Sequence, residues 1–311
     1  MNNIKKIKNI LICGLGAIGT ICASSIIKNK EYNLKILVDE NRLNKYLTQP
    51  TIFNKKEYFF DYILPTNPDF KTDLIIISTK NDGLISAIKQ IKNFIKEDTI
   101  IISLLNGIHS EQEIINIYPK ANVITSFYIG NSSIRKDREI THDGVYKIFF
   151  DEKDKNSKFL KEVFDKTKIK YEISSNIKEE YWKKFIINVG LNQLCAVENK
   201  TLNEIKKDTI LVKKLIQLMN EAKQVAQEEE KINAEKLYQE AKTFILNEMP
   251  EATPSMLQDI LNDRKTEVDI FAGKVIELGI KHKIETPINK EIFNKIKEIE
   301  KGYKKIIKNL K

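Results

Sequence analysis

The sequence has few of the residues that build metal sites or disulfide frameworks. Among its 311 residues there are only three cysteines and three histidines, and the histidines are too far apart in sequence to form a local metal-binding pair. Cys13, Cys22 and Cys195 are odd in number and fit no zinc-binding spacing, which favours reduced, buried thiols in a cytoplasmic protein. We therefore expect a cytoplasmic protein with no metal site.

Long apolar runs and nucleic-acid-binding patterns are also scarce. Beyond the segment from Asn9 to Ile27, no stretch is apolar for long enough to span a bilayer. The net charge of +9 comes mainly from lysine, and residues 295–311 hold seven lysines and two glutamates, with little interleaved arginine or aromatic residue. This pattern favours the solvated face of a terminal helix over a surface that binds a membrane or a nucleic acid. We expect neither of these partners.

The order of the predicted elements indicates two domains. Buried strands are expected at residues 9–13, 34–39, 73–79, 98–107 and 122–130, with helical patterns between them, and this alternation is typical of parallel βαβ units. Residues 138–150 alternate around a turn and predict an antiparallel addition at the sheet edge. After about residue 178, helical periodicity replaces the strand signals. The sequence thus predicts a mostly parallel α/β domain over residues 1–177 and an all-α domain over residues 178–311.

The N-terminal segment could be read as an export leader or as a phosphate-binding turn. Lysines precede an uncharged stretch, as in a leader, but that stretch also holds the pattern Gly14-x-Gly16-x-x-Gly19 between a predicted strand and a predicted helix. In such a turn the first glycine permits the bend, the second lets the backbone approach a pyrophosphate, and the third lets the helix pack on the strand. We therefore predict a dinucleotide-binding Rossmann domain with a doubly wound sheet. The expected phosphate-binding residues, at a helix N-terminus, are Gly14, Leu15, Gly16, Ala17, Ile18 and Gly19.

The residues after the second strand leave the choice of dinucleotide open. Asp39 lies twenty residues beyond Gly19, where an acidic side chain accepts hydrogen bonds from the ribose of NADH and repels a 2′-phosphate. Arg42 and Lys45 follow, and they could bind the 2′-phosphate of NADPH or could be exposed residues at a helix start.

A second polar pattern lies in the helical part of the chain. Lys184, Asn188 and Asn192 are spaced four residues apart within the apolar segment YWKKFIINVGLNQL, which places them on one helical face. Such a stripe is either the exposed face of an amphipathic helix or a set of buried groups that need partners. Lys183 is the competing lysine, but it points away from the stripe.

Four further polar residues are candidates for the same site. Ser255 and Glu267 are twelve residues apart, which is compatible with one helical face, and a carboxylate near a lysine can hold it charged and oriented. Lys80 and Asn106 follow two predicted strands, and ligands of open α/β sheets bind beyond the carboxyl ends of strands.

These segments together resemble 2-dehydropantoate 2-reductase, the ketopantoate reductase family, over nearly the whole chain. The resemblance lies in GLGAIG, in STK with Lys80, in LLNGIHSEQEI with Asn106, in WKKFIINVGLNQL and in SMLQDI…TEVD. It implies a Rossmann domain and a helical domain with the active site in the cleft. It also implies NAD(P)H-dependent reduction of 2-dehydropantoate to pantoate, in pantothenate and coenzyme A biosynthesis.

The resemblance also implies a role for each candidate residue. Lys184 is the expected proton donor, with Glu267 organising the site near the cofactor ribose. The expected substrate contacts are Asn188, Asn192 and Ser255, and the expected cofactor contacts outside the glycine turn are Arg42, Lys80, Asn106 and Glu267. The family prefers NADPH and often has an arginine where Asp39 stands here, so NADH is an alternative. Gln193 stands where a proline is common, and we expect little effect on the chemistry.

Other functions remain open from the sequence. The expected partner is a small-molecule 2-oxo acid, and a homodimer could form through apolar helical faces. A related reductase of another 2-oxo acid and a non-catalytic dinucleotide sensor are the alternative functions.

Overall fold

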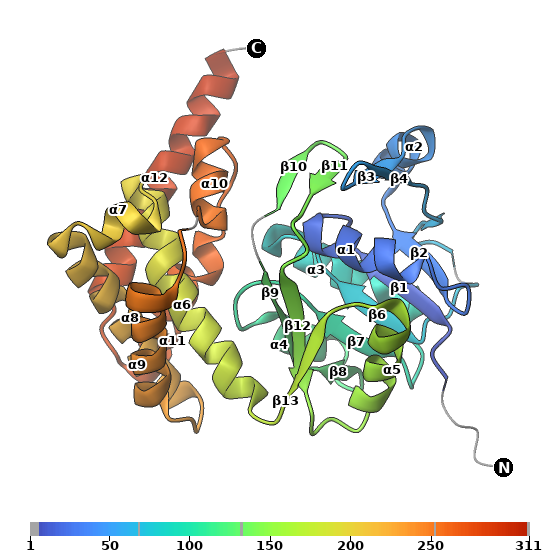
Figure 1. Cartoon of the computed structure of the whole chain (residues 1–311), viewed down its shortest axis with the longest axis horizontal. Helices are drawn as coiled ribbons and strands as arrows, with labels where there is room; N and C mark the ends of the chain where they lie inside the picture. The colour runs from blue at the N-terminus through green and yellow to red at the C-terminus, as the bar shows by residue number, and fades with distance from the viewer. Residues whose placement is uncertain (1–5, 68, 131–132, 252, 310–311) are drawn as a thin grey trace. The chain divides into compact units, whose positions relative to one another are not determined.

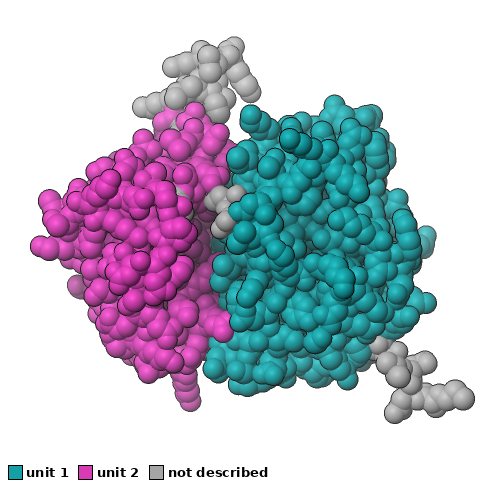
Figure 2. All heavy atoms as spheres, viewed as in Figure 1, with its two compact units in different colours: residues 1–177 teal, residues 178–311 magenta. Residues whose placement is uncertain are grey.

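The chain forms two compact units, residues 1–177 and residues 178–311 (Figure 2). The computed structural model describes residues 6–67, 69–130, 133–251 and 253–309. We call residues 1–177 the α/β unit and residues 178–311 the helical unit. Within the described residues, no helix combines the length and the apolar composition needed to cross a membrane.

A six-stranded parallel sheet forms the centre of the α/β unit (Figure 1). Its strand order is β5-β2-β1-β6-β7-β8. The strands are β1 (Asn9–Cys13), β2 (Asn33–Leu37), β5 (Tyr62–Ile63), β6 (Leu74–Ile77), β7 (Ile100–Ser103) and β8 (Asn122–Ile124). The central strands are apolar along their whole length because both faces of the sheet are covered, and Ile12 pairs with Ile36 on one side and Ile76 on the other. The predicted doubly wound α/β fold is confirmed.

Helices cover both faces of this sheet. Side chains of α1 (Ala17–Ile26) and α5 (Ser157–Thr167) share one apolar core with the sheet, and those of α3 (Leu84–Gln90) and α4 (Ser110–Ile117) share the other. Short 3₁₀ turns, η1 (Asn81–Gly83) and η2 (Ile91–Phe94), flank α3.

Two smaller sheets and a further helix complete the α/β unit. The three-stranded sheet has the order β13-β12-β9, and the four-stranded sheet has the order β10-β11-β3-β4. Their strands are β3 (Thr51–Phe53), β4 (Lys56–Tyr58), β9 (Ser126–Gly130), β10 (Ile134–Lys136), β11 (Glu139–Thr141), β12 (Tyr146–Asp151) and β13 (Tyr171–Ser174). Helix α2 (Glu40–Thr48) precedes β3 in the chain and is drawn beside the four-stranded sheet in Figure 1.

One strand prediction was wrong, and another was only partly right. Residues 122–130 do not form one strand: β8 pairs with β7, and β9 pairs with β12 in a different sheet. The antiparallel addition expected at residues 138–150 is present only in part. Strand β12 pairs antiparallel with β9, but in the separate three-stranded sheet, and β11 pairs antiparallel with β10 and in parallel with β3 in the four-stranded sheet. The Asn54 side chain donates to His142 O and accepts from His142 N, at 2.9 and 2.8 Å, so the end of β11 is held by a residue distant in sequence.

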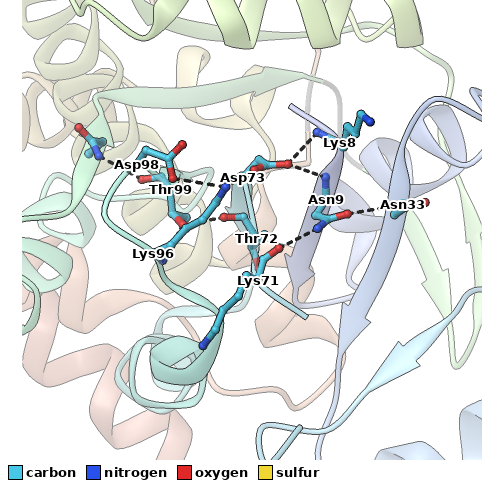
Figure 3. Close-up of polar contacts among 10 residues, drawn as sticks. Lys8, Asn9, Asn33, Lys71, Thr72, Asp73, Lys96, Asp98 and Thr99 are labelled. Atoms are coloured by element: carbon cyan, nitrogen blue, oxygen red, sulfur yellow. Dashed lines mark hydrogen bonds and ion pairs between the residues drawn. The ribbon is translucent and has the colours of Figure 1, made fainter. Parts of the chain in front are cut away.

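A polar cluster around Asp73 fixes the amino ends of the central strands (Figure 3). Asp73 Oδ2 accepts hydrogen bonds from the backbone N–H groups of Lys8 and Asn9, both at 2.8 Å, and Lys96 Nζ lies 2.5 Å from Asp73 Oδ1. Burial alone would raise the pKa of the Asp73 carboxyl, but the hydrogen bonds from Lys96, Asn9 and Lys8 outweigh it and lower that pKa. This edge lies opposite the carboxyl ends of the strands, so the cluster is structural.

The helical unit is built from α-helices, of which α6, α8 and α12 are the longest (Figure 1). Helix α8 packs against α7, α9, α11 and α12. The elements are α6 (Ile177–Glu198), α7 (Leu202–Lys206), α8 (Thr209–Glu229), α9 (Ala234–Thr243), the π-helical turn η3 (Phe244–Glu248), α10 (Ser255–Leu261), the 3₁₀ turn η4 (Val268–Ile270), α11 (Ala272–His282) and α12 (Pro287–Asn309).

The predicted single helical face for Ser255 and Glu267 was wrong. Helix α10 ends at Leu261, and Glu267 immediately precedes η4. Asp263 takes a left-handed conformation with φ of 49°, and the Arg264 backbone N–H then donates to Asp259 O at 2.8 Å. This backbone turn is a common way of ending a helix. The sequence has no glycine there, so the helix end could not be predicted from it.

Candidate functional site

The glycine turn lies between β1 and α1, against the end of β6. Gly14 has φ of +99°, and a Cβ atom there would lie 2.7 Å from Thr79 N. A Cβ atom on Gly19 would lie 1.9 Å from Gly14 O, so helix α1 packs directly on the turn. Ser78 Oγ donates a hydrogen bond to Gly14 O at 2.8 Å and joins the turn to the residue after β6. Two of the three glycines are therefore required by the fold itself.

Gly16 is different, because the fold leaves space beside it. A Cβ atom on Gly16 would have only Arg135 Nη1 and Ser78 O as described neighbours within 4 Å, both at 3.9 Å, and its φ of −81° suits any residue. Gly16 is the N-cap of α1, has no side-chain cap, and is followed by a first turn without acidic residues. The first N–H groups of α1 and this open space form a cradle that fits a phosphate group. The glycine turn thus fits a dinucleotide.

Two loops at the carboxyl ends of β6 and β7 are joined beside this turn. Lys80 is exposed and precedes η1, and Asn106 is half-buried between β7 and α4. His109 Nε2 lies 2.6 Å from Asn81 Oδ1, which ties the two loops together. No sequence pattern singles out His109 or Asn81, because their pairing depends on the adjacency of β6 and β7.

The charged side chains of Asp39, Arg42 and Lys45, after β2, are engaged in ion pairs. Asp39 is the N-cap of α2: its Oδ1 accepts from Arg42 N at 2.8 Å, and its Oδ2 lies 3.5 Å from Arg42 Nε. Lys45 Nζ lies 2.6 Å from Asp137 Oδ1, in the turn between β10 and β11. Both cations proposed to bind a 2′-phosphate therefore already have carboxylate partners.

In the helical unit, α6 carries the predicted stripe. Lys184, Asn188 and Asn192 all lie within this helix, and Asn192 Nδ2 is 3.4 Å from Asn188 Oδ1. Lys183 instead forms an ion pair with Glu240 of α9, with Nζ 3.0 Å from Oε2. Lys183 is therefore engaged by a neighbouring helix.

Ser255 and Glu267 come from separate elements. Ser255 is exposed and begins α10, and the half-buried Glu267 begins the segment that leads into α11. Next to Glu267, the N–H and hydroxyl groups of Thr266 both donate to Glu300 Oε1 of α12, at 2.8 and 2.7 Å. The Ala272 N–H donates to Gln193 Oε1 of α6 at 2.8 Å. Residues 266–272 are therefore held between α12 and α6.

Gln193 has a structural role beside the stripe. Its side chain is fully buried, and Nε2 donates to Val189 O at 2.7 Å and to Asn289 Oδ1 at 3.2 Å. Asn289, also fully buried, donates to Glu221 Oε2 at 2.7 Å, and Glu221 accepts two backbone N–H groups of α12. The amide of Gln193 therefore links α6, α11 and α12.

The three thiols do not form a reactive site. All are buried, and burial raises the pKa of Cys22 and of Cys195 to about 12 and that of Cys13 still higher. They stay protonated near neutral pH. Among the described residues, no group of three or more histidine, cysteine or carboxylate side chains is placed to hold a metal ion.

Comparison with known proteins gives the family. The family model described as "Ketopantoate reductase PanE/ApbA" matches residues 10–155, and "Ketopantoate reductase PanE/ApbA C terminal" matches residues 176–300. The 2-dehydropantoate 2-reductase of Pyrococcus horikoshii is 29% identical over 71% of this chain and 74% of its own length. That of Escherichia coli O157:H7 is 24% identical over 96% of this chain and 97% of its own length.

A solved structure supports the fold over the same extent. D-mandelate dehydrogenase, in a ternary structure with NADH and anilino(oxo)acetate, superposes with a TM-score of 0.83 at 23% identity and covers 95% of this chain and 99% of its own. The two family models together span both units of the chain. This chain therefore belongs to the ketopantoate reductase family.

Proposed function

We propose that this protein reduces 2-dehydropantoate to pantoate with a nicotinamide dinucleotide, in pantothenate and coenzyme A biosynthesis. The observation that carries the proposal is the stripe of Lys184, Asn188 and Asn192 on α6, in a chain that belongs to the ketopantoate reductase family. A bound, reduced dinucleotide supplies a hydride to the C2 carbonyl carbon of the substrate. The cradle around Gly16 and the loops with Lys80 and Asn106 are the parts of the α/β unit proposed to hold it.

Lys184 has the central role in this proposal. Negative charge develops on the carbonyl oxygen as the ketone becomes an alcohol, and a lysine ammonium stabilises that charge and donates the proton. Asn188 and Asn192 are neutral donors and acceptors that suit hydroxyl and carboxylate groups of a 2-oxo acid. Ser255 offers a further hydroxyl donor, and Glu267 is proposed to contact the cofactor ribose and to keep the site organised.

The proposed cofactor is NADPH, with NADH also accepted. The family resemblance favours NADPH, and Arg42 and Lys45 are the cations that could turn toward its 2′-phosphate. Asp39 can instead accept hydrogen bonds from the ribose hydroxyls of NADH. The ion pairs of Arg42 with Asp39 and of Lys45 with Asp137 must break before these cations can bind a 2′-phosphate. This cost reduces the difference in affinity between NADPH and NADH.

The deciding experiment is an oxidation assay with NADPH and NADH in parallel. Ketopantoate, pyruvate and an aromatic 2-oxo acid are supplied as substrates, the last because a protein of the same fold is a D-mandelate dehydrogenase. The proposal expects the highest kcat/KM with ketopantoate. A clear preference for another 2-oxo acid would identify a related reductase, and dinucleotide binding without turnover on any of them would identify a sensor.

A cytoplasmic location and a homodimer are further parts of the proposal. Cell fractionation with an antibody tests the location. Light scattering of the purified protein tests the oligomeric state, and a mass near twice 36.1 kDa is expected.

A further inference from the structure

The turn between β10 and β11 lies close to the glycine turn. Arg135 Nη1 is 3.9 Å from the position that a Cβ atom on Gly16 would occupy. That position marks the open side of the cradle, where a dinucleotide-binding turn receives the pyrophosphate. Among the residues that the structure describes, Arg135 brings the only cationic group within 4 Å of it.

The guanidinium of Arg135 is oriented by its own turn. Arg135 Nε donates a hydrogen bond to Asp137 O at 2.9 Å, and Asp137 has the left-handed φ of 48° that closes the turn. The two terminal amino groups of Arg135 have no acceptor within the described residues, and the side chain is exposed. They are therefore available to a ligand.

Helix α2 holds this turn in place. Lys45 Nζ binds Asp137 Oδ1 at 2.6 Å, and Arg138 Nη1 donates to Lys45 O at 2.8 Å. The Arg138 guanidinium also lies 4.3 Å from the centre of the Tyr46 ring, and its Nη2 donates to Thr51 Oγ1 at 3.0 Å. Arg138 is buried, so the turn is anchored by a desolvated side chain and does not depend on surface ion pairs alone.

We propose that Arg135 is a cofactor-binding residue that contacts the pyrophosphate of the dinucleotide beside Gly16. This inference rests on the proposed function, and it adds a cation that lies outside the glycine motif. A guanidinium binds phosphate oxygens with two parallel hydrogen bonds, which suits the pyrophosphate. Because NADH and NADPH share that group, Arg135 contributes equally to the binding of both.

The test is the dissociation constant of NADH and of NADPH, measured by fluorescence titration for wild type, Arg135→Gln and Lys136→Gln. Arg135→Gln is expected to raise both constants by about tenfold to a hundredfold, as for the loss of a hydrogen bond to a charged group. Lys136 is the matched control, since it neighbours Arg135 on the same strand and points to the opposite face, and its variant should bind like wild type. Arg135→Lys should recover part of the affinity.

The other possible results of the titration would contradict the role of Arg135, the proposed function, or both. Wild-type affinity in Arg135→Gln would refute the role of Arg135 and leave the proposed function intact. Loss of NADPH affinity alone would assign Arg135 to the 2′-phosphate and refute the pyrophosphate contact. If wild type binds neither dinucleotide, both proposals fail. If it binds both but does not reduce ketopantoate, the proposed substrate is wrong and the role of Arg135 stands.

Discussion

Lys183 and Glu240 form an ion pair between α6 and α9, with Nζ 3.0 Å from Oε2. The pair fixes the direction of the first of two consecutive lysines in α6. Successive residues of a helix point about a quarter turn apart, so Lys184 is on another face, in line with Asn188 and Asn192. The helical spacing already separates Lys183 from the stripe, and this contact gives Lys183 a structural partner in α9.

Replacing Lys184 should therefore remove activity, while replacing Lys183 should not. Lys184→Ala is expected to lower kcat by about two to four orders of magnitude, because general acid catalysis is lost, while dinucleotide binding persists. Lys183→Ala should keep kcat within a few fold and lower the free energy of unfolding by less than about 1 kcal/mol, as for other ion pairs at a protein surface. Steady-state kinetics measures kcat of the two variants, and denaturant unfolding measures their free energies of unfolding. Near-normal turnover in Lys184→Ala would refute its role as proton donor.

The glycines at positions 16 and 19 should fail in different ways. Gly19→Ala places a Cβ atom 1.9 Å from Gly14 O, and the resulting shift of α1 should lower the free energy of unfolding by about 2 kcal/mol or more. Gly16→Ala should cost the fold less than about 1 kcal/mol, because its Cβ atom has room. Its dissociation constant for the dinucleotide should nevertheless rise. Thermal unfolding and titration separate the two effects, and unchanged affinity in Gly16→Ala would argue against the cradle.

Asp39 should set the balance between the two dinucleotides. Asp39→Asn keeps an N-cap for α2, since asparagine caps helices as well as aspartate, but it removes the negative charge that opposes a 2′-phosphate and pairs with Arg42. The ratio of kcat/KM for NADPH to that for NADH should rise about fivefold, as for a surface charge interaction of about 1 kcal/mol. Arg42→Gln should lower the ratio, and Glu40→Gln, one residue along, should leave it unchanged. An unchanged ratio in Asp39→Asn would remove Asp39 from cofactor selection.

The Asp73 cluster should make stability depend on acid pH. The pKa of the Asp73 carboxyl is lowered in the folded state, so the unfolded chain binds the proton more readily. The contribution of Asp73 to the free energy of unfolding is therefore complete above its ordinary pKa of about 4. As the pH falls below about 4 toward the lower folded-state pKa, that contribution should be lost. Urea unfolding between pH 3 and pH 6 should show this slope in wild type and a weaker one in Asp73→Asn. Asp61→Asn, which changes an exposed carboxylate, is the control, and equal slopes in both variants would contradict the assignment.

The α/β fold class could be predicted because its signals are local. The apolar strand Asn9–Cys13, the glycines that follow and the helix after them are continuous in sequence. The errors at residues 122–130 and 138–150 have a common cause: alternation identifies a strand but does not identify its partner, and β11 finds its partner in β3, far away in the chain.

The candidate site could be predicted only in part for the same reason. The stripe on α6 is set by helical spacing, so its residues could be selected from the sequence. The position of Glu267 depends on a left-handed residue, Asp263, and on a hydrogen bond between Thr266 and Glu300. The proximity of Arg135 to Gly16 depends on how the β10–β11 turn is anchored to α2, for which the sequence carries no local signal.

The stretch from Asn122 to Gly130 has a consequence for how the α/β unit folds. Only Thr125 separates β8, in the six-stranded sheet, from β9, in the three-stranded sheet. A slip of one residue in either sheet would turn every side chain of its strand to the wrong face, and the short connection would pass the slip to the other sheet. The register of each sheet therefore constrains the register of the other. Inserting or deleting a single residue in this stretch should misalign the strand in one of the two sheets.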